Sequence, residues 1–517
     1  MAGFLEDKER NVIPRWRDFR STVVLGELDS AKPAPDTLNR SSDLSGAVAD
    51  WSEHKTASFA GDLISAALVA QDLLAAREAS EFVISLGPAA SPQLKALAMR
   101  VLVGQVPLTS EAIQPLDARM DPMFRQSPEI AEARKRLCNY PSDAVLWMDL
   151  AFMYAVRGFS QKAERAVRIA LNLAPLNRFI LRSAARFFIH INRFDIALDV
   201  IRRCPSYRSD PWLAAAEISV ALAANRSPWS TRDAYTLLAG GKFAPRHLSE
   251  LSSAMGTMEF NSGDSKKAKK LFRRSLIDPN DNSLAQARWI WQQVWGSPVD
   301  LKVDEFKIDR PFEAVTIEAL GLTDWTRALE SSLRWLADQP FSAEAARYAS
   351  YLASTIFEKF TLSEDIANFG LITHPGDPGF QITLAFCYAS TGRQPEAHDQ
   401  LSKVRNPSAE NWVDAAIEAN YGLLAFRNGE VEIGRKRYEL AVTIADRIED
   451  KRTKLAALTY WANEEIALTD GNSPRLLAEA RMAAKQATGF FNSFLIDRVA
   501  EKISRYTSHG NLGAAAL

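Results

Sequence analysis

Apolar side chains recur every three or four residues in the first half of the chain, which is the spacing of one face of an α-helix. One stripe consists of Trp147, Leu150, Ala151 and Tyr154. A second stripe carries Ala163 and Ala170, and Pro175 follows it. Because proline lacks the N–H donor that a helix interior needs, we expect the second helix to end there. The pattern predicts two packed helices in residues 144–177, with Trp147 buried.

Small residues mark the places where the two helices approach each other. Ala151 and Ala163 lie at the expected crossing, where larger side chains would push the helices apart. Gly158 lies in the turn between the helices, where a positive φ is easily adopted by glycine alone.

The same arrangement returns along the chain. The next unit begins at Arg178, 34 residues after Ala144. Its markers are Ala184, Ala185, Phe188, Phe194, Ala197 and Ile201. The unit that begins at Ser249 carries Gly256, Gly263, Ala268 and Phe272. The unit that begins at Pro378 carries Leu384, Ala385, Tyr388, Gly392, Ala397 and Leu401. The unit that begins at Ala415 carries Gly422, Ala425, Gly429, Gly434, Tyr438 and Ala441. A period of this length predicts stacked helix pairs, and 517 residues are too many for one compact core.

The unit at residues 144–177 resembles the tetratricopeptide repeat, in its order of aromatic, Leu, small residue and Tyr, and in its length. The resemblance implies an all-α fold, an α-α superhelical solenoid of helix pairs in one array or two. It further implies that first helices line a concave groove and that the chain binds other proteins. A fold alone carries no reaction, because function depends on the sites placed on it.

Two segments without helical periodicity divide the chain. Residues 29–45 are rich in Pro, Ser and Asp and predict a linker, and Gly296–Pro311 interrupts the helices near mid-chain. We therefore expect an N-terminal arm and linker (1–45), a first array (46–295), an interruption (296–311), a second array (312–505) and a flexible tail (506–517). Asp210-Pro211 and Asp377-Pro378 are predicted helix starts, with an N-cap acid before a proline.

Composition narrows the function. The 62 Lys and Arg nearly balance the 63 Asp and Glu, which argues against a dedicated nucleic-acid binder but not against a local patch. No stretch approaches 18 uncharged apolar residues, and the first residues carry charges where a signal peptide needs an apolar core. We expect a cytoplasmic protein without a membrane segment. Its oligomeric state is left open.

Catalytic and metal-binding patterns are missing from the sequence. Three separated cysteines and six scattered histidines form no metal-ligand spacing, and no phosphate-binding loop or nucleophile elbow occurs. We therefore predict that the chain is not an enzyme and needs no cofactor or metal.

The candidate partner-binding residues lie on the first helices of two adjacent units. Arg182, Arg186 and His190 follow one another at four-residue intervals, and Met148 and Phe152 occupy the matching floor of the preceding unit. A solvated face paired with neighbouring acids is one interpretation. The other is a groove for a helix or extended peptide, in which arginine forks hold a carboxylate or phosphate.

Three further segments leave two interpretations each. The basic run of Lys266, Lys267, Lys269, Lys270, Arg273 and Arg274 is a solvated face or a patch for nucleic acid or acidic protein. Trp289, Trp291 and Trp295 cannot share one helix face, so they form a core seam or an interface anchor. Residues 11–28 pack back on the first helices or dock on a partner subunit.

The function favoured by these patterns is a non-catalytic scaffold or adaptor subunit that binds a protein partner in the groove. A sensor that binds an acidic, phosphorylated or nucleotide-like ligand through Arg182 and Arg186 is one alternative. A nucleic-acid-associated repeat protein that uses the basic run is the other.

Overall fold

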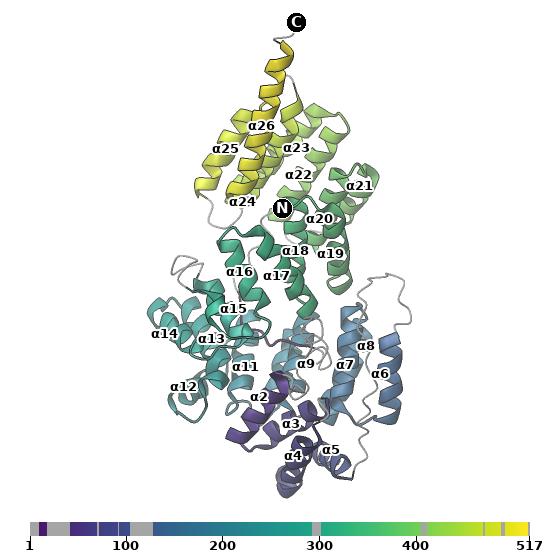
Figure 1. The fold of residues 1–517 in the computed structure, drawn as a ribbon, viewed down its shortest axis with the longest axis vertical. Coiled ribbons are helices and arrows are strands. Elements are labelled where there is room, and N and C mark those ends of the chain that lie inside the picture. Colours follow the sequence, from purple (N-terminus) through teal and green to yellow (C-terminus); the bar gives the residue numbers. More distant parts are fainter. Residues whose placement is uncertain are drawn as a thin grey trace, which may run out of the picture. The chain divides into compact units, whose positions relative to one another are not determined.

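The computed structural model describes residues 10–17, 42–69, 72–90, 92–103, 128–291, 301–404, 411–468, 471–486 and 492–514. Helices form nearly all of this part of the chain, and it contains no β-strand (Figure 1). The predicted all-α class is therefore confirmed. Residues 29–41 of the expected linker lie outside the described residues, and so does Trp295.

The chain divides into two compact units. The N-terminal unit comprises Asn11–Ala287 and Phe306–Pro311. The C-terminal unit comprises Met1–Arg10, Arg288–Glu305 and Phe312–Leu517, as far as these residues are described.

In the N-terminal unit, most helices pack on the next one along the chain. The helices are α2 (Ser42–Glu53), α3 (Ala57–Val69), α4 (Leu73–Ser85), α5 (Pro92–Leu102), α6 (Pro128–Asn139), α7 (Ala144–Val156), α8 (Ser160–Leu173), α9 (Arg178–His190), α10 (Phe194–Arg202), α11 (Pro211–Ala223), α12 (Thr231–Ala239), α13 (Pro245–Asn261) and α14 (Ser265–Ser275). Helix α15 (Asp281–Ile290) contributes its residues up to Ala287.

The C-terminal unit repeats this arrangement. Its helices are α16 (Phe312–Gly321), α17 (Trp325–Asp338), α18 (Ala343–Tyr351), α19 (Phe360–Thr373), α20 (Pro378–Ser390), α21 (Gln394–Lys403), α22 (Trp412–Arg427), α23 (Val431–Arg447), α24 (Lys451–Glu464), α25 (Ser473–Gln486) and α26 (Asn492–Ala514). Residues 301–311, before α16, hold one 3-10 turn at Val303–Glu305.

Several turns and helix ends lie where the sequence predicts them. Gly158 adopts a φ of 74° between α7 and α8, and α8 ends at Leu173, two residues before Pro175. Asp210 caps α11 by accepting hydrogen bonds from the Trp212 and Leu213 amides, with Pro211 as the first helical residue. Asp377 caps α20 in the same way.

Glycine at a helix crossing permits close approach of a large neighbour. A Cβ atom on Gly256 would lie 3.0 Å from the buried Phe272 ring, across the α13–α14 contact. A Cβ on Gly422 would lie 2.7 Å from Tyr438 of α23. The small residues of the repeat therefore set the distance between paired helices.

Two predictions fail in detail. Trp147 is only partly buried, because it lies in the first turn of α7 and its indole N–H donates to the Pro141 carbonyl at 2.8 Å. Met148 and Ala151 fill the core instead. Helix α26 continues to Ala514, past the expected end at Arg505.

Candidate functional site

A short non-helical segment, residues 11–17, lies against α7, α9 and α15 of the N-terminal unit, whereas residues 18–28 lie outside the described residues. We call it the N-terminal segment. Val12, Pro14 and Trp16 are buried, whereas the residues between them are partly exposed. Burial of alternate side chains is typical of an extended chain with one face against a protein surface.

Aromatic contacts hold the end of this segment. The Trp16 ring meets the Phe152 ring of α7 edge-on at 5.3 Å, with an interplanar angle of 88°. It meets the Phe187 ring of α9 at 5.9 Å and 83°. Edge-to-face pairs of this kind contribute about 0.5–1.5 kcal/mol each beyond the apolar area that they bury. Only 2% of Trp16 remains exposed, so the segment is anchored by a fully desolvated indole.

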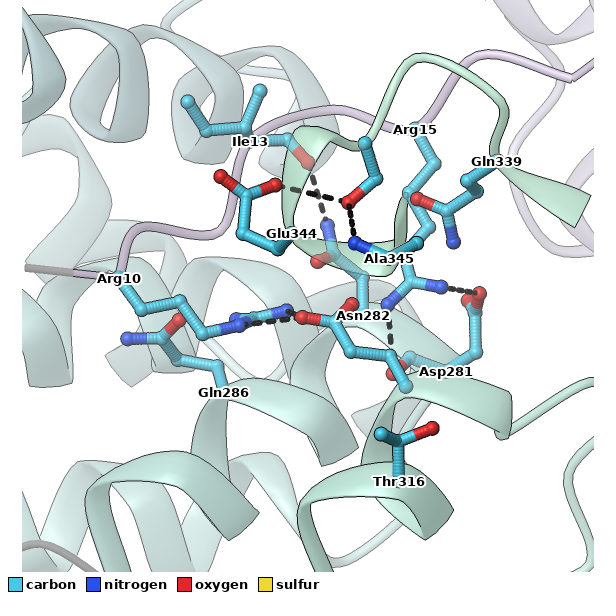
Figure 2. A network of polar contacts seen from close by, with 12 residues as sticks. Arg10, Ile13, Arg15, Asp281, Asn282, Gln286, Thr316, Gln339, Glu344 and Ala345 are labelled. Atoms are coloured by element: carbon cyan, nitrogen blue, oxygen red, sulfur yellow. Dashed lines mark hydrogen bonds and ion pairs between the residues drawn. The ribbon is translucent and has the colours of Figure 1, made fainter. Parts of the chain in front are cut away.

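A carboxylate holds the two arginines of the segment. Asp281, the first residue of α15, lies 2.5 Å from Arg15 Nη1 and 2.5 Å from Arg17 Nη2. Figure 2 shows the Arg15 guanidinium reaching Asp281. Burial acts to raise the pKa of Asp281, but the two guanidinium groups outweigh it and lower that pKa to about 2. The carboxylate is therefore ionised whenever the segment is bound at neutral pH.

The side-chain amide of Asn282 binds the backbone of the segment. Asn282 Nδ2 donates to the Ile13 carbonyl oxygen at 3.0 Å, and only 2% of Asn282 is exposed (Figure 2). Glu250 Oε1 lies 3.5 Å from the same Asn282 nitrogen and accepts from Asn280 at 2.8 Å. Such a contact depends on the course of the peptide backbone and not on the side chain of residue 13.

We define the segment-binding face as Phe152, Phe187, Asp281 and Asn282. Of the predicted partner-binding residues, Phe152 belongs to it. Arg182 is linked to this face through Glu250. Its Nη2 donates to Glu250 at 2.7 Å, and Glu250 in turn accepts from Asn280 and Asn282. That guanidinium also lies over the Trp212 ring, 4.9 Å from the centroid. Arg182 is thus engaged within the unit.

The other predicted residues do not touch the segment in the contacts that are described. Met148 is 0% exposed and packs inside α7's pair. Arg186 and His190 are partly buried on α9, and both make further contacts within the chain. Sequence reasoning missed Asp281, Asn282 and Phe187. The period-2 pattern of Val12, Pro14 and Trp16 was a usable signal for the segment itself.

The basic run lies on α14, as expected. Lys266, Lys267, Lys270 and Arg273 are exposed, whereas Lys269 and Arg274 are partly buried. Two members have partners in the unit: Lys267 Nζ lies 2.8 Å from Glu259, and Arg274 donates to the Leu238 carbonyl. Trp289 and Trp291 are partly buried, and Trp295 lies outside the described residues.

A buried charge cluster ties α2 and α3 to the repeats. The Arg178 guanidinium of α9 lies 2.9 Å from Asp62, 3.5 Å from Asp50 and 3.9 Å from Asp210. His247 of α13 lies 3.0 Å from Asp50 and 3.1 Å from Glu53. Burial raises the pKa of Asp62 to about 6 even though Arg178 opposes the shift. These contacts link α2 and α3 to α9 and α13 through buried polar side chains.

The geometry decides the fold class of the repeats. Helix pairs that begin 33–36 residues apart follow one another from α7 to α15 and from α18 to α22, with glycine at positive φ in the turns after α7, α13, α20 and α22. The described residues therefore fold as a repeat of helix pairs, many of them with the length of the tetratricopeptide unit.

Comparisons with known proteins assign no family and no function to the chain. No family model matches the sequence, and no curated protein matches it. Yeast Tom70 is similar with a TM-score of 0.28 and 15% identity, over 69% of this chain and 92% of that one. The APC/C hetero-tetramer Cut9-Hcn1 is similar with a TM-score of 0.39 and 11% identity, over 95% and 93%. The human IFIT1 dimer with PPP-AAAA gives 0.31 and 13%, over 92% and 96%.

Among the described residues, no group of three His, Cys, Asp or Glu side chains is arranged to hold a metal ion. Likewise, none of the helices described is both long and apolar enough to cross a membrane.

Proposed function

We propose that this protein is a non-catalytic interaction scaffold whose N-terminal unit receives an extended peptide segment of a partner protein on the segment-binding face. One observation carries the proposal: a seven-residue non-helical segment, residues 11–17, already occupies that face, with alternate side chains buried. A surface that accommodates one extended peptide has the contacts needed to accommodate another.

The face combines the three contacts by which proteins recognise extended peptides. Phe152 and Phe187 contact an aromatic anchor, Asn282 bonds a main-chain carbonyl, and Asp281 pairs with basic side chains. Buried aromatic and arginine residues are the groups that dominate binding energy at interfaces. Main-chain hydrogen bonds add affinity that is independent of sequence.

The alternative functions have less support from the contacts. A phosphate or carboxylate bound by Arg182 would have to displace Glu250, whose side chain is only 4% exposed. Nucleic acid would find exposed Lys266, Lys270 and Arg273 on α14, but the chain's formal net charge is −1. A cytoplasmic location remains part of the proposal.

The proposal is tested by capture from the native host on immobilised full-length chain, followed by mass spectrometry. Phe152→Arg places a charge against the aromatic anchor and should lower the amount of specific partner captured at least tenfold. Ile277→Arg, at an exposed site far along the sequence, should capture the same amount as the wild type. Circular dichroism checks that both variants remain helical. Equal capture by both variants would place the interface elsewhere and contradict the proposal.

A further inference from the structure

We infer that residues 11–17 are an internal ligand, and that the partner segment is an extended basic and aromatic peptide that competes with them for the segment-binding face. This inference rests on the proposed function, because it specifies the chemistry of the peptide bound there. It adds that the free chain holds its own site closed.

The chemistry of the partner follows from the contacts that the face makes. Trp16 sits edge-on to two phenylalanine rings and is 2% exposed, so the face selects an aromatic side chain at that position. Val12 is 0% exposed and Pro14 is buried, which favours apolar residues at the two preceding alternate positions. Asn282 bonds the Ile13 main chain, so the intervening position is free to vary.

Charge decides between a basic and an acidic partner. Asp281 is 12% exposed at its side chain and is paired only with arginines of the segment in the contacts that are described. The charge of Glu250 is already balanced by Arg182 at 2.7 Å. Without residues 11–17 the face therefore keeps an uncompensated carboxylate, which attracts an arginine-containing peptide and repels an acidic or phosphorylated one.

Covalent attachment makes the N-terminal segment a strong competitor. Residues 18–41, twenty-four in number (42 − 17 − 1), join it to α2. A ligand tethered by a short linker acts at an effective concentration on the order of millimolar. If the segment occupies nine chains in ten, a competing peptide binds about tenfold more weakly than it would to an open face.

The test uses the full-length chain and a fluorescent peptide with the sequence of residues 11–17, Asn-Val-Ile-Pro-Arg-Trp-Arg. Fluorescence anisotropy measures its binding to the wild type, to Trp16→Asp, and to Trp229→Asp as the control for an exposed tryptophan. We expect Trp16→Asp to bind the peptide at least tenfold more tightly than the other two chains. A second peptide, with both arginines replaced by Glu, should bind none of them measurably.

Two results would overturn the inference. Equal affinity of the peptide for wild type and Trp16→Asp would show that residues 11–17 do not compete. Equal affinity of the basic and acidic peptides for Trp16→Asp would show that Asp281 does not select charge. In both cases a partner whose capture depends on Phe152 would leave the proposed function standing, whereas capture independent of Phe152 would remove that function by itself.

A measurement on the wild type covers the possibility that Trp16→Asp fails to fold. Hydrogen exchange of residues 11–17, followed by mass spectrometry, should accelerate when an isotopically labelled peptide of the same sequence is added in excess. Unchanged exchange would overturn the inference. Light scattering over a range of concentrations tests whether residues 11–17 of a second copy occupy the face instead. A wild-type dimer that becomes monomeric in Trp16→Asp would mean that the segments are exchanged between copies. This result would contradict an internal ligand.

Discussion

Gly256 shows how one absent side chain sets the distance between two helices. A Cβ at this position would lie 3.0–3.1 Å from three atoms of the Phe272 ring, which is fully buried. Helix propensity favours replacing glycine by up to about 1 kcal/mol, so Gly256→Ala should be close to neutral. Gly256→Leu adds three more carbons, and we expect it to lower the free energy of unfolding by about 1–3 kcal/mol, measured by denaturant titration.

The double variant Gly256→Leu/Phe272→Ala isolates the contact. Since the alanine removes the ring that the leucine strikes, the two changes should be strongly non-additive. Additive effects would mean that the leucine disturbs something other than the α13–α14 crossing.

Asp281 makes the anchoring of the N-terminal segment dependent on pH. Arg15 and Arg17 lower the pKa of Asp281 from 3.8 to about 2, against the opposing effect of burial. A carboxyl group whose pKa is lower in the folded state stabilises that state above the unfolded pKa and loses this effect as the pH falls through the folded one. The stability advantage of wild type over Asp281→Asn should therefore be about 2 kcal/mol at pH 6–7 and shrink between pH 4 and pH 2. Thermal denaturation across this range measures it, and a constant difference would contradict the pairing.

Some of these residues could be predicted and others could not. Gly158, Gly256 and Phe152 follow from local spacing, since a helix fixes which residues share a face within a few turns. Asp281 and Arg15 are 266 residues apart in sequence, and no local pattern pairs them. The alternation of Val12, Pro14 and Trp16 is visible in the sequence, but the surface that buries these side chains depends on the tertiary fold.

At the scale of helices, the charge cluster around Arg178 carries the next prediction. Arg178 is 6% exposed and faces Asp50 of α2, Asp62 of α3 and Asp210. Removal of one partner from a buried ion pair costs about 3–5 kcal/mol, because the remaining charges stay buried without compensation. Arg178→Met should therefore destabilise the N-terminal unit by this amount and raise hydrogen exchange first in α2 and α3.

A matched arginine supplies the control. Arg168 forms an exposed pair with Glu164 on α8, and pairs of that kind contribute about 0.3–0.5 kcal/mol. Arg168→Met should leave exchange in α2 and α3 unchanged. If the two variants behave alike, the cluster does not hold these helices.

Individual helices were predicted best where small residues marked the crossings. The spacing in Asp324–Ser342 predicts the second helix of a pair with Ala328 at the close crossing, and α17 spans Trp325–Asp338 with Ala328 fully buried. Trp147 was misplaced because its position at the first turn of α7 leaves one side of the indole beside the exposed Pro141. Periodicity identifies the buried face of a helix, whereas the depth of burial along that face depends on what lies beyond its ends.

For the whole molecule, the division into two compact units bears on how the free energy of unfolding is distributed along the chain, and the sequence alone does not show this division. In a stack of helix pairs each pair contacts its neighbours, so local stability is a sum of pair and neighbour contributions. We propose on this basis that the two units respond separately to a local defect.

Gly422→Leu in the C-terminal unit tests this separation. A Cβ on Gly422 would lie 2.7 Å from the Tyr438 ring, which is 1% exposed, so the added side chain has to push α22 and α23 apart. Overpacking of this kind costs about 1–3 kcal/mol, which corresponds to hydrogen exchange about 5- to 150-fold faster in the helices that it loosens. Mass spectrometry should find this acceleration in α22 and α23 while α9, α10 and α11 exchange at wild-type rates. Gly61→Ala serves as the control, because its Cβ would meet its neighbours at an ordinary 3.4 Å. Equal acceleration throughout the chain in Gly422→Leu would instead mean that both units unfold as one cooperative block, since only a shared transition transmits a defect in α22 to α9.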